Sequence, residues 1–171
     1  MIQIALLGFG VVGSGTAEVL IKNRSLIEKH SGKQVEIKYI LDLRDFPDHP
    51  LGGRVVHDFN LILNDPEISV VAEMMGGSHP ALEFTKAALE AGKHVVTSNK
   101  EVVANYGDEL LEIARERGVN YLFEASVGGG IPIIHPMQTD LSSNKILAVS
   151  GILNGTTNFI LTKMKDEGQN P

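Results

Sequence analysis

The 171-residue sequence contains no cysteine. This absence excludes disulfides and thiolate metal sites, and it also excludes catalysis by a thiol nucleophile. Reactions that pass through a thioester on the chain are therefore ruled out.

Long apolar runs and clusters of basic residues are also absent. No run approaches the ~20 apolar residues that span a bilayer, and no basic stretch precedes an apolar segment at the N-terminus. The 15 basic residues are scattered singly among 21 acidic ones, and the net charge is −6. We therefore expect no membrane segment, no secretion and no nucleic-acid partner.

Hydrophobic residues make up 43% of the chain, which is enough to build a real core. The length fits one large domain, or one domain and part of another.

The first thirteen residues are the most informative stretch. An apolar run from Ile2 to Leu7 stops at Gly8-x-Gly10-x-x-Gly13, and a helix pattern follows. In a dinucleotide-binding turn the first glycine allows a sharp bend, the second lets a pyrophosphate approach bare backbone, and the third lets helix and strand pack closely. The helix N-terminus then offers N–H groups to the phosphates. An ordinary glycine-rich turn is the alternative, but the flanking strand and helix favour a cofactor site formed by Gly8, Phe9, Gly10, Val11, Val12 and Gly13.

The second strand pattern, residues 35–43, leads to the expected contact with the adenosine ribose. It follows a first helix predicted over residues 12–30, and Asp42 and Arg44 stand at its end. An aspartate there accepts hydrogen bonds from the 2′-hydroxyl of NAD, whereas an arginine pairs with the 2′-phosphate of NADP. Both residue types are present, so the cofactor stays open at this point. Solvated charges on a surface loop are the alternative.

Two further strand patterns end in glycine or in polar residues. Residues 70–75 run into Gly76, and residues 94–97 run into Ser98 and Lys100. In a parallel α/β sheet, ligands bind beyond the carboxyl ends of the strands. We therefore expect one crevice to be lined by the glycine turn together with Gly76, Thr97, Ser98 and Lys100.

Strand and helix patterns alternate as far as about Ala125. Helices are predicted over residues 60–64, 81–91 and 108–117, and a last strand over residues 119–124. This alternation predicts five or six parallel strands joined by right-handed crossovers, which is a Rossmann-type, doubly wound α/β sheet. We place this NAD(P)-binding domain at residues 1–130.

Residues 131–171 read as the beginning of a second α/β domain, for substrate binding and dimerisation, that is cut short. The three consecutive glycines before it, Gly128 to Gly130, indicate a hinge or backbone folded tightly around a ligand. A helix over residues 133–141, a strand over 145–153 and a helix capped by Asn154 are expected next. A strand and an apolar helix with almost no sequence left to cover them predict an incomplete domain.

Motifs along the entire chain resemble those of the homoserine dehydrogenase family, in order and in spacing. They are Gly8-Phe9-Gly10-Val11-Val12-Gly13, Ser98-Asn99-Lys100, Glu124-Ala125-Ser126-Val127-Gly128-Gly129-Gly130-Ile131-Pro132-Ile133 and Gly151-Ile152-Leu153-Asn154-Gly155-Thr156-Thr157-Asn158-Phe159-Ile160-Leu161. The resemblance implies NAD(P)-dependent interconversion of L-homoserine and L-aspartate 4-semialdehyde, on the route to threonine, methionine and isoleucine. It also implies a cytoplasmic homodimer whose second domain supplies the substrate pocket and much of the dimer interface.

The resemblance assigns roles to particular residues. Lys100 would lie near the nicotinamide and the reacting oxygen, where its ammonium can stabilise negative charge or deliver a proton. Arg44 and Asp45 match the family's Arg-Asp pair, which favours NADP, while Asp42 keeps NAD possible.

A monovalent cation is a further implication. In the family, the loop that matches residues 124–131 wraps such an ion, mostly through backbone oxygens. The resemblance therefore implies an ion such as Na⁺ bound by Glu124, Val127, Gly129 and Ile131. Peptide carbonyls and one carboxylate suit a hard, weakly charged ion and would not suit zinc.

The chain departs from the family pattern in length. In the family, the acidic residues that hold the homoserine amino group and a second lysine, the main acid/base candidate, lie beyond position 171. We therefore expect this chain to bind the cofactor without turning over homoserine.

Rival interpretations come from other classes of protein. A semialdehyde dehydrogenase that acylates a thiol is excluded by the absence of cysteine. Sugar oxidoreductases with a Glu-Lys-Pro motif fit less well, because the order here is Asn99-Lys100-Glu101. A non-catalytic nucleotide-sensing module stays open, and it predicts that Lys100→Ala changes no activity of the full-length protein.

Overall fold

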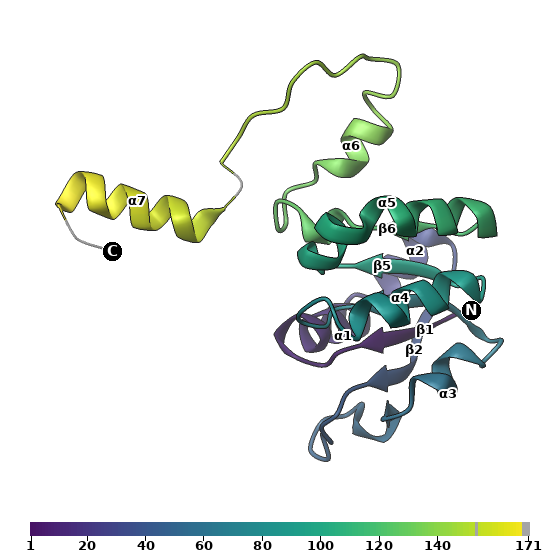
Figure 1. The fold of residues 1–171 in the computed structure, drawn as a ribbon. Helices are drawn as coiled ribbons and strands as arrows, with labels where there is room; N and C mark the ends of the chain where they lie inside the picture. The colour runs from purple at the N-terminus through teal and green to yellow at the C-terminus, as the bar shows by residue number, and fades with distance from the viewer. Residues whose placement is uncertain (153, 169–171) are drawn as a thin grey trace. The chain divides into compact units, whose positions relative to one another are not determined.

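The computed structural model describes residues 1–152 and 154–168. The chain divides into two compact units, Met1–Ser126 and Val127–Pro171. The first unit contains a sheet with helices around it, and the second contains short helical segments (Figure 1). No helix within the described ranges has the length and apolar character needed to cross a membrane.

A parallel sheet of six strands forms the centre of the first unit, in the order β3-β2-β1-β4-β5-β6. From β1 the chain moves outward to β2 and β3, and then returns across β1 to add the other strands on the far side. The predicted doubly wound fold is confirmed, and its switch point lies between β1 and β4. The strands are β1 (Ile2–Leu7), β2 (Val35–Leu41), β3 (Val55–Val56), β4 (Ile68–Glu73), β5 (His94–Thr97) and β6 (Tyr121–Leu122).

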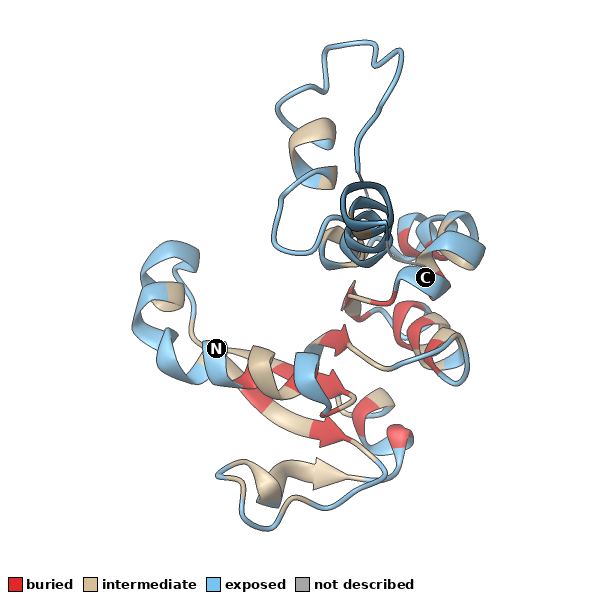
Figure 2. Cartoon of the chain, turned by 90° about the vertical axis from the view of Figure 1, so that its left-hand side faces the viewer, coloured by how far each residue is buried: buried red, intermediate tan, exposed pale blue. Residues whose placement is uncertain are grey.

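Two hydrophobic clusters take alternate residues of the central strand. Ile4 and Leu6 of β1 belong to one cluster, whereas Ala5 and Leu7 belong to the other. This division follows from the two-residue period of a strand, which sends successive side chains to opposite faces of the sheet. Figure 2 shows the buried residues gathered on the strands and on one side of the helices beside them. The helices of this unit are α1 (Val11–Lys22), α2 (Arg24–Ser31), η1 (Gly52–Arg54), α3 (Phe59–Leu63), α4 (Ala81–Glu90), α5 (Lys100–Arg117) and η2 (Glu124–Ser126).

The prediction of one helix over residues 12–30 is wrong, because α1 ends at Lys22 and α2 begins at Arg24. Asn23 separates them with φ −102° and ψ 17°, outside the helical region. Asparagine has a low helix propensity, and α2 buries none of its residues, so packing does not hold a continuous helix together.

The helix predicted over residues 108–117 begins eight residues earlier, at Lys100. The Asn99 side chain caps it by accepting a hydrogen bond from the Val102 N–H, at 3.2 Å. Residues 98–101 were interpreted as a polar strand end, and the capping role of Asn99 was missed. Lys100 consequently stands in the first turn of α5 and not in a loop.

Other boundaries differ by a few residues. The strand predicted over 35–43 ends at Leu41, and the one predicted over 119–124 is confined to Tyr121–Leu122. The edge strand β3 was not predicted. It has only two residues, which pair with β2, and so short a strand produces no recognisable sequence pattern.

The second unit contains α6 (Ile134–Gln138), shorter than the helix predicted over 133–141, and α7 (Gly155–Glu167). The predicted cap of α7 is confirmed, since the Asn154 side chain accepts from the Thr157 N–H at 2.8 Å. The strand predicted over 145–153 is wrong for residues 145–152, and Leu153 lies outside the described residues. Leu147 is 85% exposed, and no strand among this unit's described residues is available to pair with the segment.

The contact between α1 and the turn after β1 gives a stability prediction. A Cβ at Gly13 would lie 2.1 Å from the Gly8 carbonyl oxygen, whereas a Cβ at Gly15 would meet no atom within 4 Å. We expect Gly13→Ala to lower the free energy of unfolding by about 2–4 kcal/mol. Gly15→Ala, in the same helix, should raise it by about 0.5–1 kcal/mol. Urea unfolding followed by circular dichroism measures both, and equal stability of the two variants would contradict the contact.

Candidate dinucleotide site

The carboxyl ends of three neighbouring strands lie in register. Leu7, the last residue of β1, pairs with Glu73, the last residue of β4, and Glu73 pairs with Thr97, the last residue of β5. The segments that follow these strands therefore leave the same edge of the sheet. They contain the predicted residues Gly8 to Gly13, Gly76, Ser98 and Lys100.

The glycine turn has the backbone geometry that its sequence requires. Gly8 has φ +89°, and a Cβ there would stand 3.0 Å from the Met74 carbonyl oxygen, so a larger residue would be strained and crowded. At Gly10 a Cβ would meet nothing within 4 Å. The space beside the Gly10 backbone is therefore free for a phosphate group.

The N-terminus of α1 is suited to an anion. Gly10 is its N-cap and forms no side-chain hydrogen bond, and no acidic residue occupies the first turn. Among the described residues no side chain caps the N–H groups of this first turn, and the positive end of the helix dipole adds to their attraction for a phosphate. Val11 is 92% exposed and Val12 is 52% exposed, so both stand at the surface of this turn.

Phe9 has a structural role through its side chain. It is buried, and its ring makes edge-on contacts with Phe46 and His49, each with 5.0 Å between ring centroids. Its backbone N–H donates to the Asp42 carboxylate at 2.7 Å. Phe9 thus contributes to the site by fixing the turn to the end of β2.

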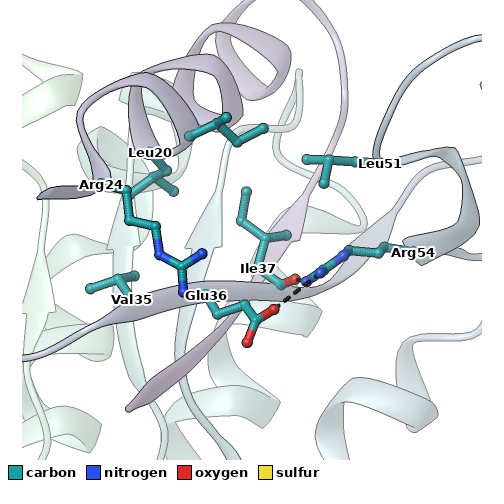
Figure 3. A pocket seen from close by; sticks show the side chains of 8 residues that line it. Leu20, Arg24, Val35, Glu36, Ile37, Leu51 and Arg54 are labelled. Atoms are coloured by element: carbon teal, nitrogen blue, oxygen red, sulfur yellow. Dashed lines mark hydrogen bonds and ion pairs between the residues drawn. The ribbon is translucent and has the colours of Figure 1, made fainter.

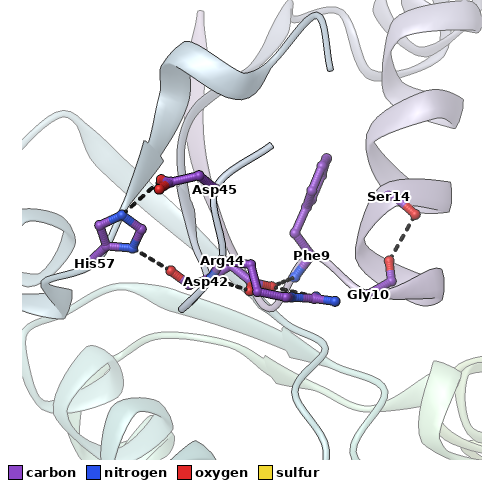
Figure 4. A network of polar contacts seen from close by, with 7 residues as sticks. All are labelled: Phe9, Gly10, Ser14, Asp42, Arg44, Asp45 and His57. Carbon is purple, nitrogen blue, oxygen red and sulfur yellow. Dashed lines mark hydrogen bonds and ion pairs between the residues drawn. The ribbon is translucent and has the colours of Figure 1, made fainter. Parts of the chain in front are cut away.

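Asp42 and Arg44 form a bidentate ion pair at the end of β2 (Figure 4). The guanidinium Nε and Nη2 lie 3.0 and 3.1 Å from the two carboxylate oxygens. This hydrogen-bonded pairing, together with backbone N–H donors, holds the pKa of Asp42 at about 2. The Arg44 side chain remains 62% exposed, and its guanidinium lies 5.1 Å from the centre of the Phe46 ring. It can therefore accept a further anionic partner from solvent.

His57 joins the same network, and the sequence did not assign it to the site. Its Nδ1 lies 2.7 Å from the Asp42 carbonyl oxygen, and its Nε2 lies 3.1 Å from the Asp45 carboxylate. The hydrogen bond to the Asp42 carbonyl, followed by the bond to Asp45, raises the pKa of His57. These partners are 15 and 12 residues away, so no local pattern indicated them.

Glu73 is a second residue that the sequence did not single out. It is 0% exposed, and its carboxylate accepts hydrogen bonds from the Thr97 hydroxyl and from the Met75 N–H, the latter at 2.7 Å. Burial raises the pKa of this carboxyl, since desolvation disfavours the charged form more than the hydrogen bonds favour it. The sequence did not indicate a role for Glu73, because its partner Thr97 lies 24 residues away at the end of a different strand.

A largely apolar cavity of about 370 Å³ lies beside these strand ends. Val12 and Thr16 of α1 contribute to one part of its lining, and residues from β4, β5 and the segment after β6 complete it. Its walls are mostly hydrophobic with a few polar groups, as is usual for a small-molecule pocket. The full lining is Val12, Thr16, Ala72, Glu73, Met74, Val96, Thr97, Ser98, Leu122, Glu124 and Ala125.

A second hollow lies at the other end of the sheet (Figure 3). It is lined by Val35 and Glu36 at the start of β2, where Val35 pairs with Ile2. Arg54 pairs with Glu36 at 3.1 Å across it. Because ligands of doubly wound sheets bind at the carboxyl ends of the strands, this hollow is not the candidate site.

Lys100 is exposed and enters no ion pair among the described residues. It directly follows Asn99, whose side-chain amide donates to the Gly77 carbonyl at 2.7 Å. The ammonium is thus carried by a helix whose first turn is tied to the turn after β4.

The four residues predicted to bind a monovalent cation fall on both sides of the division between the units. Glu124 lies in η2, and Val127, Gly129 and Ile131 belong to the second unit. There the Ile131 N–H donates to the Gly128 carbonyl at 3.2 Å, and Gly128 and Gly129 have left-handed φ values of +71° and +62°. This tight turn supplies carbonyl groups of the kind that a hard ion prefers, and no cluster of three carboxylate or imidazole groups occurs among the described residues.

The pairing of Asp42 predicts a loss of stability in acid. Its pKa is lowered from 3.8 to about 2, so the stabilisation is complete above about pH 4 and disappears as the pH falls to about 2. We expect Asp42→Asn to lower the free energy of unfolding at pH 7 by about 1–2 kcal/mol, a value reduced for the exposure of Arg44. Urea unfolding should show no difference from wild type near pH 2, and the exposed Asp48→Asn is the control. A difference that is constant with pH would contradict the role of the ion pair.

Comparison with known proteins agrees with this geometry. Residues 8–124 match the family model for the NAD-binding domain of homoserine dehydrogenase, and residues 132–170 match the homoserine dehydrogenase model. The homoserine dehydrogenase of Synechocystis sp. is 44% identical over 170 residues, covering 98% of this chain and 39% of that protein. The Bacillus subtilis enzyme is 42% identical over 173 residues, covering 97% and 39%.

Solved structures give the same result. A homoserine dehydrogenase from Thiobacillus denitrificans aligns with a TM-score of 0.90 and 41% identity, covering 98% of this chain and 39% of that one. A hyperthermophilic archaeal homoserine dehydrogenase in complex with NADPH aligns with a TM-score of 0.84 and 28% identity, covering 99% and 57%. The chain thus spans 39% of the length of the curated relatives named above. On the matched family models, the sequence identity and the shared fold together, this chain belongs to the homoserine dehydrogenase family.

Proposed function

We propose that the first unit binds NADP(H) across the carboxyl edge of its sheet, as part of an enzyme that interconverts L-homoserine and L-aspartate 4-semialdehyde. The observation that carries the proposal is the register of Leu7, Glu73 and Thr97. Because of this register, the glycine turn and the segment that leads to Lys100 begin at the same edge of the sheet. A phosphate at the N-terminus of α1 and a reacting group near Lys100 can then belong to one extended ligand.

The choice of NADP over NAD rests on Arg44. The Asp42 carboxylate already accepts from the Phe9 N–H and from the Arg44 guanidinium, so it is engaged before any ribose arrives. The exposed guanidinium can pair bidentately with a 2′-phosphate while the Phe46 ring supports it. The archaeal relative solved with NADPH supports the same choice.

Lys100 supplies the charge that the reaction needs. When bound, NADPH would supply the hydride for the aldehyde carbon. Negative charge then develops on the aldehyde oxygen, and the Lys100 ammonium stabilises it or delivers the proton that completes the alcohol. The position of Lys100 in the first turn of α5, shortly after the carboxyl end of β5, supports this role.

The monovalent cation and the homodimer are further parts of the proposal. Glu124, Val127, Gly129 and Ile131 would hold an ion such as Na⁺ through one carboxylate and backbone carbonyls, which is the donor set that such an ion prefers. We propose that the full-length enzyme is a cytoplasmic homodimer, and that residues outside this chain hold the homoserine amino group.

The cofactor choice can be tested by titration calorimetry with NADPH and NADH on the chain. Arg44→Gln should weaken NADPH binding roughly 10- to 100-fold, because one charge-assisted pair with the 2′-phosphate is lost. NADH, which lacks this phosphate, should change by less than about three-fold. Arg24→Gln, in the hollow at the other end of the sheet, is the matched control. An equal loss for both cofactors would show that Arg44 does not read the phosphate.

Catalysis can be followed by the absorbance of the reduced nicotinamide. We expect the chain of 171 residues to bind NADPH but to produce no absorbance change with homoserine and NADP⁺. The full-length protein should show turnover, and Lys100→Ala there should lower kcat roughly 10²- to 10⁴-fold. Turnover by the isolated chain, or an unchanged kcat of the Lys100→Ala variant, would contradict the proposal, and the latter result would favour the sensing module.

A further inference from the structure

Glu73 carries a buried carboxylate. It is 0% exposed, and none of the ion pairs among the described residues includes it. A buried carboxylate is costly unless hydrogen bonds or a helix dipole compensate it. A buried polar group whose hydrogen bonds are satisfied makes the segments around it rigid.

The carboxylate ties together two segments that follow different strands. On the β4 side, its Oε1 accepts from the Met75 N–H at 2.7 Å. On the β5 side, its Oε2 accepts from the Thr97 hydroxyl, and the Asn99 side-chain amide lies 3.4 Å from Oε1. One side chain therefore fixes the turn after β4 against the segment after β5.

Asn99 extends this network to α5. Its amide donates to the Gly77 carbonyl at 2.7 Å, and its oxygen accepts from the Val102 N–H at 3.2 Å. The Thr97 hydroxyl accepts from the Asn99 N–H at 2.9 Å. The first turn of α5, which carries Lys100, is held in place by groups that themselves bind Glu73, and its positive dipole end favours a nearby carboxylate.

We propose that Glu73 is a positioning residue, whose carboxylate aligns the turn at residues 75–77 with the first turn of α5 so that the nicotinamide half of the cofactor is bound beside Lys100. This inference rests on the proposed cofactor role. The adenosine half is different, because among the described residues no side-chain hydrogen bond links Glu73 to the glycine turn or to the pair formed by Asp42 and Arg44. Loss of the carboxylate should consequently weaken one half of the ligand and spare the other.

Two probes separate the halves: NADPH, and adenosine 2′,5′-bisphosphate, which lacks the nicotinamide. The dissociation constant of each is measured on the chain by titration calorimetry, and NADPH emission reports the surroundings of the ring. Wild type should bind NADPH more tightly than the bisphosphate. Glu73→Leu should weaken NADPH binding about ten-fold or more, reduce the change in NADPH emission, and leave the bisphosphate within about two-fold.

Two companion variants make the test specific. Glu73→Gln keeps an oxygen acceptor for the Met75 N–H and should hold NADPH within about three-fold of wild type. Thr97→Val removes the hydroxyl that donates to Glu73 and accepts from the Asn99 N–H, and it should give the same selective loss on a smaller scale if Glu73→Leu does not fold. Ile62→Ala, a buried position in α3, should lower stability without changing the ratio of the two affinities.

The outcomes distinguish the role of Glu73 from the proposed cofactor role of the chain. If Glu73→Leu and Thr97→Val weaken both probes equally, or change neither, Glu73 is only structural and the inference is overturned. Wild type that binds NADPH no better than the bisphosphate overturns it as well. Wild type that binds neither probe overturns the proposed cofactor role itself.

Discussion

The close approach of α1 to the turn after β1 is the constraint on which the candidate site depends. Position 13 has room for a hydrogen atom but not for a methyl group, because the Gly8 carbonyl oxygen stands 2.1 Å from where a Cβ would lie. This approach brings the N-terminus of α1 to the edge of the sheet. The register of β1, β4 and β5 then brings the segments after β4 and β5 to the same edge. A wider separation would leave the N-terminus of α1, where we propose that phosphate binds, away from Lys100.

Two carboxylates organise this edge by opposite electrostatic means. Asp42 is paired with Arg44, and the pairing keeps its pKa at about 2. No ion pair among the residues that the structure describes includes Glu73, and burial raises its pKa. Each accepts a backbone N–H from a turn, from Phe9 in one case and from Met75 in the other. The first therefore holds the proposed adenosine side of the site through an ion pair, and the second holds the proposed nicotinamide side through neutral donors.

Most of the architecture followed from local patterns, and the errors have physical causes. Apolar strands that alternate with helices predicted the parallel sheet, since each pattern has its own period. The break at Asn23 was missed because the low helix propensity of a single residue interrupts a helix only where tertiary packing is weak, as it is in α2. The start of α5 was missed because Asn99 acts as a cap through its side chain. The prediction of a strand over residues 145–152 was wrong because a strand needs a neighbouring strand to pair with, and a sequence pattern does not show whether one is present.

The glycine turn was predictable from the amino-acid sequence alone, because a backbone that must bend sharply or pack closely accepts almost no residue but glycine. The motifs along the chain were also enough to indicate the family. Which polar groups meet became clear only in the folded chain. Glu73 finds Thr97 and Asn99 at separations of 24 and 26 residues, and His57 finds Asp42 at 15. Hydrogen bonds between such distant residues depend on the register of neighbouring strands, and a local pattern does not contain that register.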